Sequence, residues 1–80
     1  MKNPVRFSNN EEQTLFVFKE DDNCLLQVAC ILSHETTVVN IPHGSHISVK
    51  RGHSIGGFIV PSETIFETSI SHNYVIFNIS

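Results

Sequence analysis

Residues 14–32 read TLFVFKEDDNCLLQVACIL, and this stretch decides the fold class of the chain. Two apolar runs flank a polar segment at residues 20–23, whose Asp and Asn side chains can hydrogen-bond to the backbone of a bend. In both runs, large apolar residues occupy successive positions, which is typical of strands that are covered on both faces. The stretch therefore predicts two strands, at residues 14–20 and 24–32, joined by a turn.

A short helix over residues 23–32 is the alternative, because one set of apolar residues in this run would share a helical face. That set is Leu25, Leu26, Ala29 and Cys30. The same run contains the β-branched residues Val28 and Ile31, which favour a strand. We therefore prefer the strand.

The rest of the chain repeats the pattern of short apolar runs separated by turn residues. Further strands are predicted at residues 36–41, 46–51, 55–60, 64–70 and 74–79. Pro42 and Pro61 are expected to end strands, and Gly56-Gly57 to form a bulge. These runs predict an all-β fold, either a small antiparallel barrel or a two-sheet sandwich of about seven or eight short strands.

An internal similarity at a spacing of 38 residues suggests two related halves. Residues 33–41 read SHETTVVNI and residues 71–79 read SHNYVIFNI, with four identical positions. Upstream, Val28 corresponds to Phe66 and Leu32 to Ile70. The two segments are consistent with duplication or with convergence on the same strand pattern, and the sequence leaves both open.

Length and composition indicate one domain of 80 residues. Residues 1–13 lack a strong apolar pattern and are expected to form a partly ordered arm. They also lack the apolar core of an export signal, and the chain has no apolar run long enough to cross a membrane. We therefore expect a cytoplasmic protein.

The two cysteines, Cys24 and Cys30, lie in one predicted strand. Six residues of strand separate their Cα atoms by about 20 Å, whereas a disulfide requires about 7 Å or less. They are expected to be small buried side chains. An intermolecular disulfide is the alternative.

Charge is distributed unevenly around the net value of −3. Residues 9–35 contain six acids and one base, whereas residues 41–60 contain two bases, three histidines and no acid. Glycines interleave with these basic groups, so backbone could approach an anion closely there. The candidate ligand- or partner-binding residues are His43, His46, Lys50, Arg51, His53, Gly56 and Gly57.

Catalysis is not predicted, because the chain has no Gly-x-Ser-x-Gly elbow, no phosphate-binding glycine loop and no evident acid–base pair. Three-histidine coordination within residues 43–53 is geometrically poor, so neither a metal nor a cofactor is expected. Nucleic acid is disfavoured because only Lys50 and Arg51 stand together as a basic pair.

The sequence therefore favours a non-catalytic module that binds or assembles with other proteins. Two strands with apolar residues on both faces are difficult to bury in so short a chain, so we expect a homo-oligomer. Its interface is predicted at Phe16, Phe18 and Leu25. Small accessory, structural or inhibitory proteins of phages and bacteria have this size and composition. The alternative is a protein that sequesters or senses a small anion, such as a phosphate or nucleotide, through residues 43–57.

Overall fold

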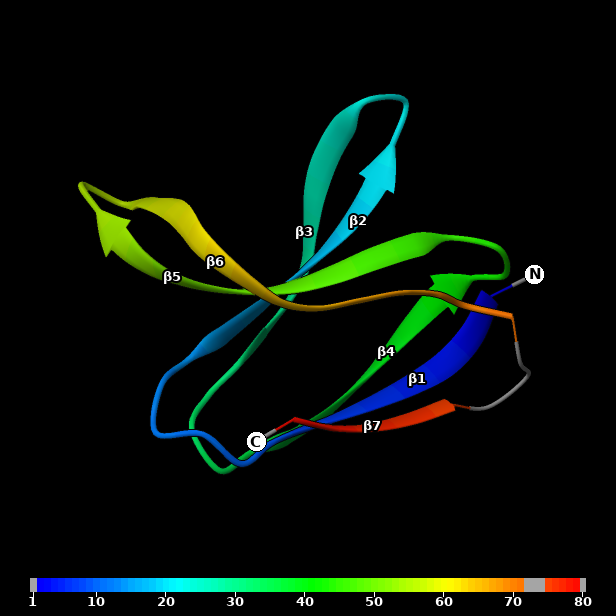
Figure 1. Ribbon diagram of the computed structural model, residues 1–80, viewed down its shortest axis with the longest axis horizontal. Coiled ribbons are helices and arrows are strands. Elements are labelled where there is room, and N and C mark those ends of the chain that lie inside the picture. The colour runs from blue at the N-terminus through cyan, green and yellow to red at the C-terminus, as the bar shows by residue number, and fades with distance from the viewer. Residues whose placement is uncertain (1, 72–74, 80) are drawn as a thin grey trace.

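The computed structural model describes residues 2–71 and 75–79, and these residues form seven strands and no helix. The strands are β1 (Lys2–Asn9), β2 (Leu15–Asp21), β3 (Cys24–Ile31), β4 (Thr36–Pro42), β5 (His46–Ile55), β6 (Phe58–Ser69) and β7 (Val75–Ile79). Figure 1 shows β4, β1 and β7 next to one another and the β2–β3 and β5–β6 hairpins extending beyond them. The expected all-β class is confirmed, and the strand prediction for residues 24–32 prevails over the helix.

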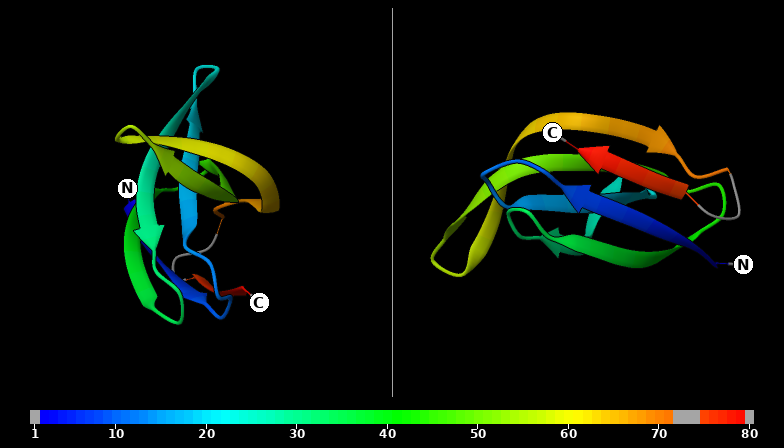
Figure 2. Two further views of the ribbon diagram at one scale, coloured as in Figure 1. Left: turned by 90° about the vertical axis from the view of Figure 1, so that its left-hand side faces the viewer. Right: turned by 90° about the horizontal axis from the view of Figure 1, so that it is seen from below.

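The strands pair in two sheets with the orders β4-β1-β7 and β3-β2-β5-β6. Within the described residues the sheets do not close into a barrel, so the sandwich is the observed alternative. The pairing is antiparallel except between β1 and β7, which are parallel. Figure 2 (right) shows β1 between β4 and β7.

The expectation of a partly ordered N-terminal arm is wrong for residues 2–9, because they form the central strand of the smaller sheet. Val5 and Phe7 point inward and are fully buried. Pro4 conceals this strand in the sequence, since proline is rarely found within a central strand. Among the described residues, Pro4 pairs with Asn40 of β4, and β7 pairs with residues 5–9 of β1.

The core lies between the two sheets and is built from inward-facing residues of both. Its buried members are Val5, Phe7, Leu15, Val17, Ile31, Ile41, Ile47, Val49, Ile70 and Ile79. The shortest dimension of the molecule is 18 Å, and sheets that pack face to face lie about 10 Å apart.

Two local expectations around β5 and β6 are corrected. Gly56-Gly57 forms the turn between the two strands, with positive φ at both residues, and not a bulge inside a strand. Pro61 lies within β6 and does not end a strand, whereas Pro42 is the last residue of β4, as expected. The register shifts instead near Lys50, where β5 and β6 pair irregularly.

The two cysteines are also placed differently from the expectation. Cys24 and Cys30 are both exposed on β3, the outermost strand of its sheet. The prediction that they are buried apolar side chains is therefore wrong.

The topology gives the 38-residue similarity a spatial meaning. β3 and β6 are the two outer strands of the larger sheet, and β4 and β7 are the two outer strands of the smaller one. Since β4 is antiparallel and β7 parallel to β1, the units β2-β3-β4 and β5-β6-β7 are arranged as if related by a two-fold axis through β1.

Burial follows the same correspondence for most of the paired positions. Ile41 and Ile79 are both buried, and Val38 and Ile76 are both exposed. Leu32 and Ile70 differ, since only Ile70 is buried. His72 and Tyr74, which also belong to the compared segments, lie outside the described residues.

Candidate binding surface

The residues proposed from sequence as one ligand site do not converge in space. His43 and Gly44 lie in the β4–β5 turn, whereas His53 and Gly56 lie near the opposite end of β5. Because β5 is a continuous strand, the seven residue steps from His46 to His53 span about 23 Å. The described residues also enclose no pocket, and no three or more of their His, Cys, Asp and Glu side chains form a group able to hold a metal.

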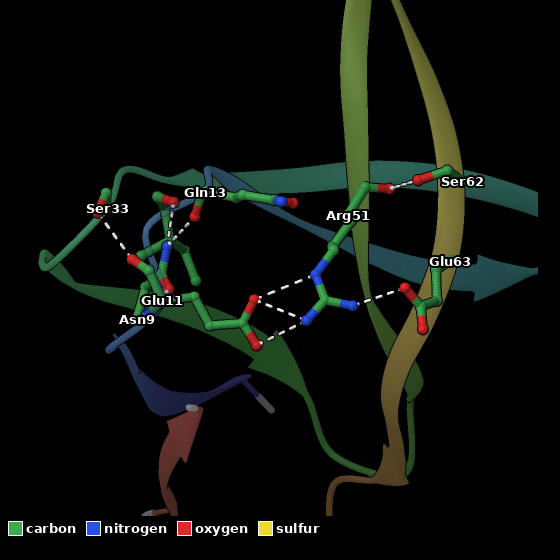
Figure 3. Close-up of polar contacts among 8 residues, drawn as sticks. Asn9, Glu11, Gln13, Ser33, Arg51, Ser62 and Glu63 are labelled. Carbon is green, nitrogen blue, oxygen red and sulfur yellow. Dashed lines mark hydrogen bonds and ion pairs between the residues drawn. The ribbon is translucent and has the colours of Figure 1, made fainter.

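Arg51, the central cation of this segment, is held by two carboxylates (Figure 3). Its Nε donates to Glu11 Oε1 at 3.1 Å, and its Nη2 donates to Glu11 Oε1 and Oε2 at 2.9 and 3.0 Å. Its Nη1 donates to Glu63 Oε2 at 2.6 Å. An incoming anion would therefore have to displace a carboxylate from Arg51.

The same contacts raise the pKa of Arg51 above its ordinary value, first through the hydrogen bonds to Glu11 and then through those to Glu63. A raised pKa in the folded state favours folding below the unfolded-state pKa, and this contribution is lost only as the pH rises through the folded-state value. Arg51 therefore remains charged and paired throughout the neutral range. Arg51 therefore acts as a structural clamp, because it binds Glu11 of the β1–β2 loop and Glu63 of β6 at the same time.

Asn9 supports this clamp from the end of β1 (Figure 3). Its buried amide nitrogen donates to the backbone carbonyls of Gln13, Ile31 and Leu32, at 2.8, 3.0 and 3.2 Å. Its Oδ1 accepts the backbone N–H of Glu11 at 2.8 Å. The Ser33 hydroxyl donates to the Glu11 carbonyl at 2.7 Å, so the β1–β2 and β3–β4 loops are joined at one end of the sandwich.

Sequence reasoning misses this polar cluster of Asn9, Glu11, Ser33, Arg51 and Glu63. Its acids and its base are 40 and 12 residues apart along the chain, and the expectation of a loose N-terminal arm removes Asn9 from consideration. The one available signal is a lone Arg among acids at strand ends, which is too general to identify a contact.

The other basic groups of residues 43–57 also contact their own chain. Asn3 Nδ2 donates to His43 Nδ1 at 3.2 Å. His46 lies 3.3 Å from Glu67 Oε1 and 3.4 Å from Ser69 Oγ, and Lys50 Nζ donates to Thr64 Oγ1. His53 is exposed.

The predicted interface residues fall in two different environments. Phe16 and Phe18 are buried within the chain, whereas Leu25 is 50% exposed. The ring of Phe16 packs against Gly52, where an added Cβ would lie 3.1 Å from Cδ2 of the ring. Of the three, only Leu25 is therefore available to a partner in this conformation.

Two hairpin ends project away from the sandwich (Figure 1). They carry five of the eight large apolar residues that are exposed among the described residues, and the other three are Leu32, Val38 and Ile76. We call residues 20–27 the β2–β3 arm and residues 53–60 the β5–β6 arm. The large exposed apolar residues of the arms are Leu25, Leu26, Ile55, Phe58 and Val60. Phe58 at the second tip is 77% exposed, the highest value among them. Figure 2 (left) shows the two tips separated from each other.

Comparison of this chain with protein-family models, with curated proteins and with solved structures finds no match. Within the described residues, no helix is long and apolar enough to cross a membrane.

Proposed function

We propose that this protein is a non-catalytic assembly module that self-associates through its two hairpin arms. The observation that carries the proposal is the concentration of exposed apolar side chains on these arms. Isolated exposed apolar residues are ordinary on protein surfaces, but a group of them marks an interaction site. The exposed apolar residues of each arm come from positions close together in one hairpin.

The backbone of the arms supports the same proposal. Every residue of the β2–β3 arm is exposed, so this part of the hairpin is a two-stranded ribbon without a packed face. Such ribbons are marginally stable in water, and added strands or a packed face stabilise them. Full burial of one Leu or Phe side chain contributes about 1.5–3 kcal/mol. A partner on the arms therefore stabilises both the complex and the fold.

An anion-binding function has less support from the geometry. Its strongest cation, Arg51, already contacts Glu11 and Glu63, and the remaining basic side chains are distributed along β5. We therefore place self-association first.

Sedimentation velocity over a wide range of protein concentration tests this function. Two double variants remove the apolar groups of one arm each: Leu25→Ser with Leu26→Ser, and Ile55→Ser with Phe58→Ser. The matched control is Val38→Ser, because Val38 is 57% exposed but lies on β4, away from both arms.

We expect the wild-type protein and the control to associate in a concentration-dependent manner, and at least one arm variant to shift toward monomer. A wild-type protein that remains monomeric at every concentration would contradict the proposal. Association that is unchanged in both arm variants would contradict it as well.

A further inference from the structure

The turn of the β2–β3 arm determines which residue pairs of the hairpin are hydrogen-bonded to each other. The loop consists of Asp22 and Asn23, whose φ values of 47° and 68° are those a type I′ hairpin turn requires. In such a turn the flanking residues, here Asp21 and Cys24, are hydrogen-bonded across the loop. Antiparallel pairs then alternate between hydrogen-bonded and non-hydrogen-bonded.

Counting outward from the turn identifies the backbone groups that face away from β2. The pair Glu20–Leu25 is non-hydrogen-bonded, Lys19–Leu26 is hydrogen-bonded, and Phe18–Gln27 is again non-hydrogen-bonded. The N–H and C=O groups of Leu25 and Gln27 therefore point outward along the edge of the sheet. Beyond Gln27 the register shifts at Val28, which ends the regular segment.

The register shift at Val28 is one feature that limits strand pairing at an edge, but residues 24–27 before it carry no other. β3 reads CLLQVACI and contains neither a charged residue nor a proline. Within the described residues, the regular part of β3 thus presents unpaired backbone groups together with exposed leucines, the combination that most readily templates another strand.

The β5–β6 arm differs at the corresponding edge. Its turn residues, Gly56 and Gly57, also have positive φ, so the same counting applies. The pair Gly52–Pro61 falls in a non-hydrogen-bonded position, which directs the nitrogen of Pro61 outward. Because proline has no N–H, this edge lacks a donor where β3 has one.

We infer that two copies of this chain pair through β3, antiparallel about a two-fold axis at Leu26. This inference rests on the proposed self-association and specifies its interface. In this register Leu25 of each copy lies opposite Gln27 of the other copy. The outward N–H and C=O groups of both residues are therefore hydrogen-bonded between the copies. Leu26 meets Leu26 of the second copy on the axis.

The second copy is the occupant that fits this edge best. A two-fold pair joins two uncharged segments, so no like charges face each other in β3. The antiparallel direction also places the two acidic turns, with Asp21 and Asp22, at opposite ends of the new ribbon. The two arms become one four-stranded ribbon, which removes the instability of each isolated hairpin.

Cysteine cross-linking tests the register. In a Cys24→Ser, Cys30→Ser background, Leu26→Cys places two thiols on the axis, with Cα atoms about 4.5 Å apart in a non-hydrogen-bonded pair, within disulfide range. Leu25→Cys is the matched control, because the two leucines are 50% and 48% exposed. The two residues at position 25 are diagonal neighbours across the paired strands and lie about 7–8 Å apart.

With a mild oxidant, we expect Leu26→Cys to form a covalent dimer at least about tenfold faster than Leu25→Cys. Equal rates for the two variants would overturn the register. If the wild-type protein associates and Leu26→Cys does not cross-link, this inference fails while the proposed function stands. If the wild-type protein is monomeric, both fail.

Charge pairing at the axis provides a second, reversible test. Leu26→Lys and Leu26→Glu each place like charges opposite each other, and each removes two buried leucines from the interface. We expect either variant alone to raise the dimer dissociation constant at least about tenfold. Mixing them in equal amounts should restore a heterodimer, and failure of the mixture to associate better than either variant would overturn the two-fold contact at Leu26.

Discussion

At the scale of single residues, Gly52 shows how closely the β5–β6 hairpin approaches β2. A Cβ at this position would lie 2.9 Å from the carbonyl oxygen of Val60 and 3.1 Å from the ring of Phe16. Both distances are too short for ordinary packing. The contact with Val60 involves a backbone oxygen, which cannot move by a side-chain rotation. Glycine is therefore required here by space alone.

Gly52→Ala should lower the free energy of unfolding by about 1–3 kcal/mol, the usual range for a side chain forced into a packed site. Urea denaturation followed by circular dichroism measures the change. Ser54→Ala is the control, because Ser54 is exposed on the same strand and should leave the midpoint unchanged. A Gly52→Ala protein with the wild-type free energy of unfolding would show that the hairpin does not pack closely against Phe16.

Asn9 offers a second test at this scale, because its amide donates to three carbonyl oxygens while almost fully buried. Asn9→Asp retains the shape but directs a carboxylate oxygen at those carbonyls. We expect a loss of about 3 kcal/mol or more at neutral pH, because the buried carboxylate keeps only the Glu11 N–H as a donor while its other oxygen faces three carbonyl oxygens.

The pH dependence of Asn9→Asp has a definite sign. Burial and the surrounding carbonyls raise the pKa of the introduced carboxyl in the folded state, so the destabilisation grows as the pH rises and fades below about pH 4. Asn10→Asp makes the same chemical change one residue away at an exposed position and should be nearly neutral. Equal effects of the two variants at neutral pH would contradict the role of Asn9.

At the scale of the strands, the sequence predicts most where alternation is strong or where apolar runs are continuous. Residues 14–32 are correctly predicted as two strands because their apolar runs are continuous. β1 is not predicted, since only Val5 and Phe7 among its eight residues are large, apolar and inward-facing, and Pro4 argues against a central strand. Gly56-Gly57 is compatible with either a bulge or a two-residue turn, and local sequence does not decide between them.

The candidate site is less predictable than the strands. Phe16 and Phe18 are predicted to need a partner because residues 14–20 are apolar on both faces. The structure covers Phe16 with the Gly52 region of the same chain, a contact that depends on which hairpin folds over which sheet. By contrast, Leu25, the third predicted interface residue, is 50% exposed. Its role in an interface stays a prediction.

Pro61 is expected to limit strand pairing at the outer edge of β6. Its nitrogen faces outward by the counting from the Gly56-Gly57 turn, so Pro61→Thr would supply a donor to this edge. We expect this variant to associate more strongly than the wild-type protein in sedimentation velocity. Ser62→Thr is the control, since it places the same side chain on the next residue of β6 and adds no backbone donor. Identical association of both variants would indicate that Pro61 does not protect the edge.

At the scale of the whole molecule, an aromatic chain joins the two sheets. The ring of Phe7 on β1 stacks on Phe77 of β7 with centroids 5.6 Å apart, and Phe77 packs on Phe66 of β6 at 4.8 Å. β1 is also the strand on which β4 and β7 both depend for pairing. The N-terminal strand therefore links the two similar halves of the chain, although it belongs to neither.

Phe7→Ala should for this reason destabilise the whole fold and not the smaller sheet alone. The expected loss is about 3–5 kcal/mol for a buried Phe, against a total stability of about 4–12 kcal/mol for a chain of this length. Thermal unfolding followed by far-ultraviolet circular dichroism, and separately by the amide signals of β2 and β5, should show one coincident transition at a much lower temperature. Arg6→Ala, an exposed neighbour on the same strand, should leave the transition in place. If the amides of β2 and β5 instead retained their wild-type transition in Phe7→Ala, the four-stranded sheet would be an independent unit, because its stability would then not depend on the Phe7–Phe77–Phe66 contact.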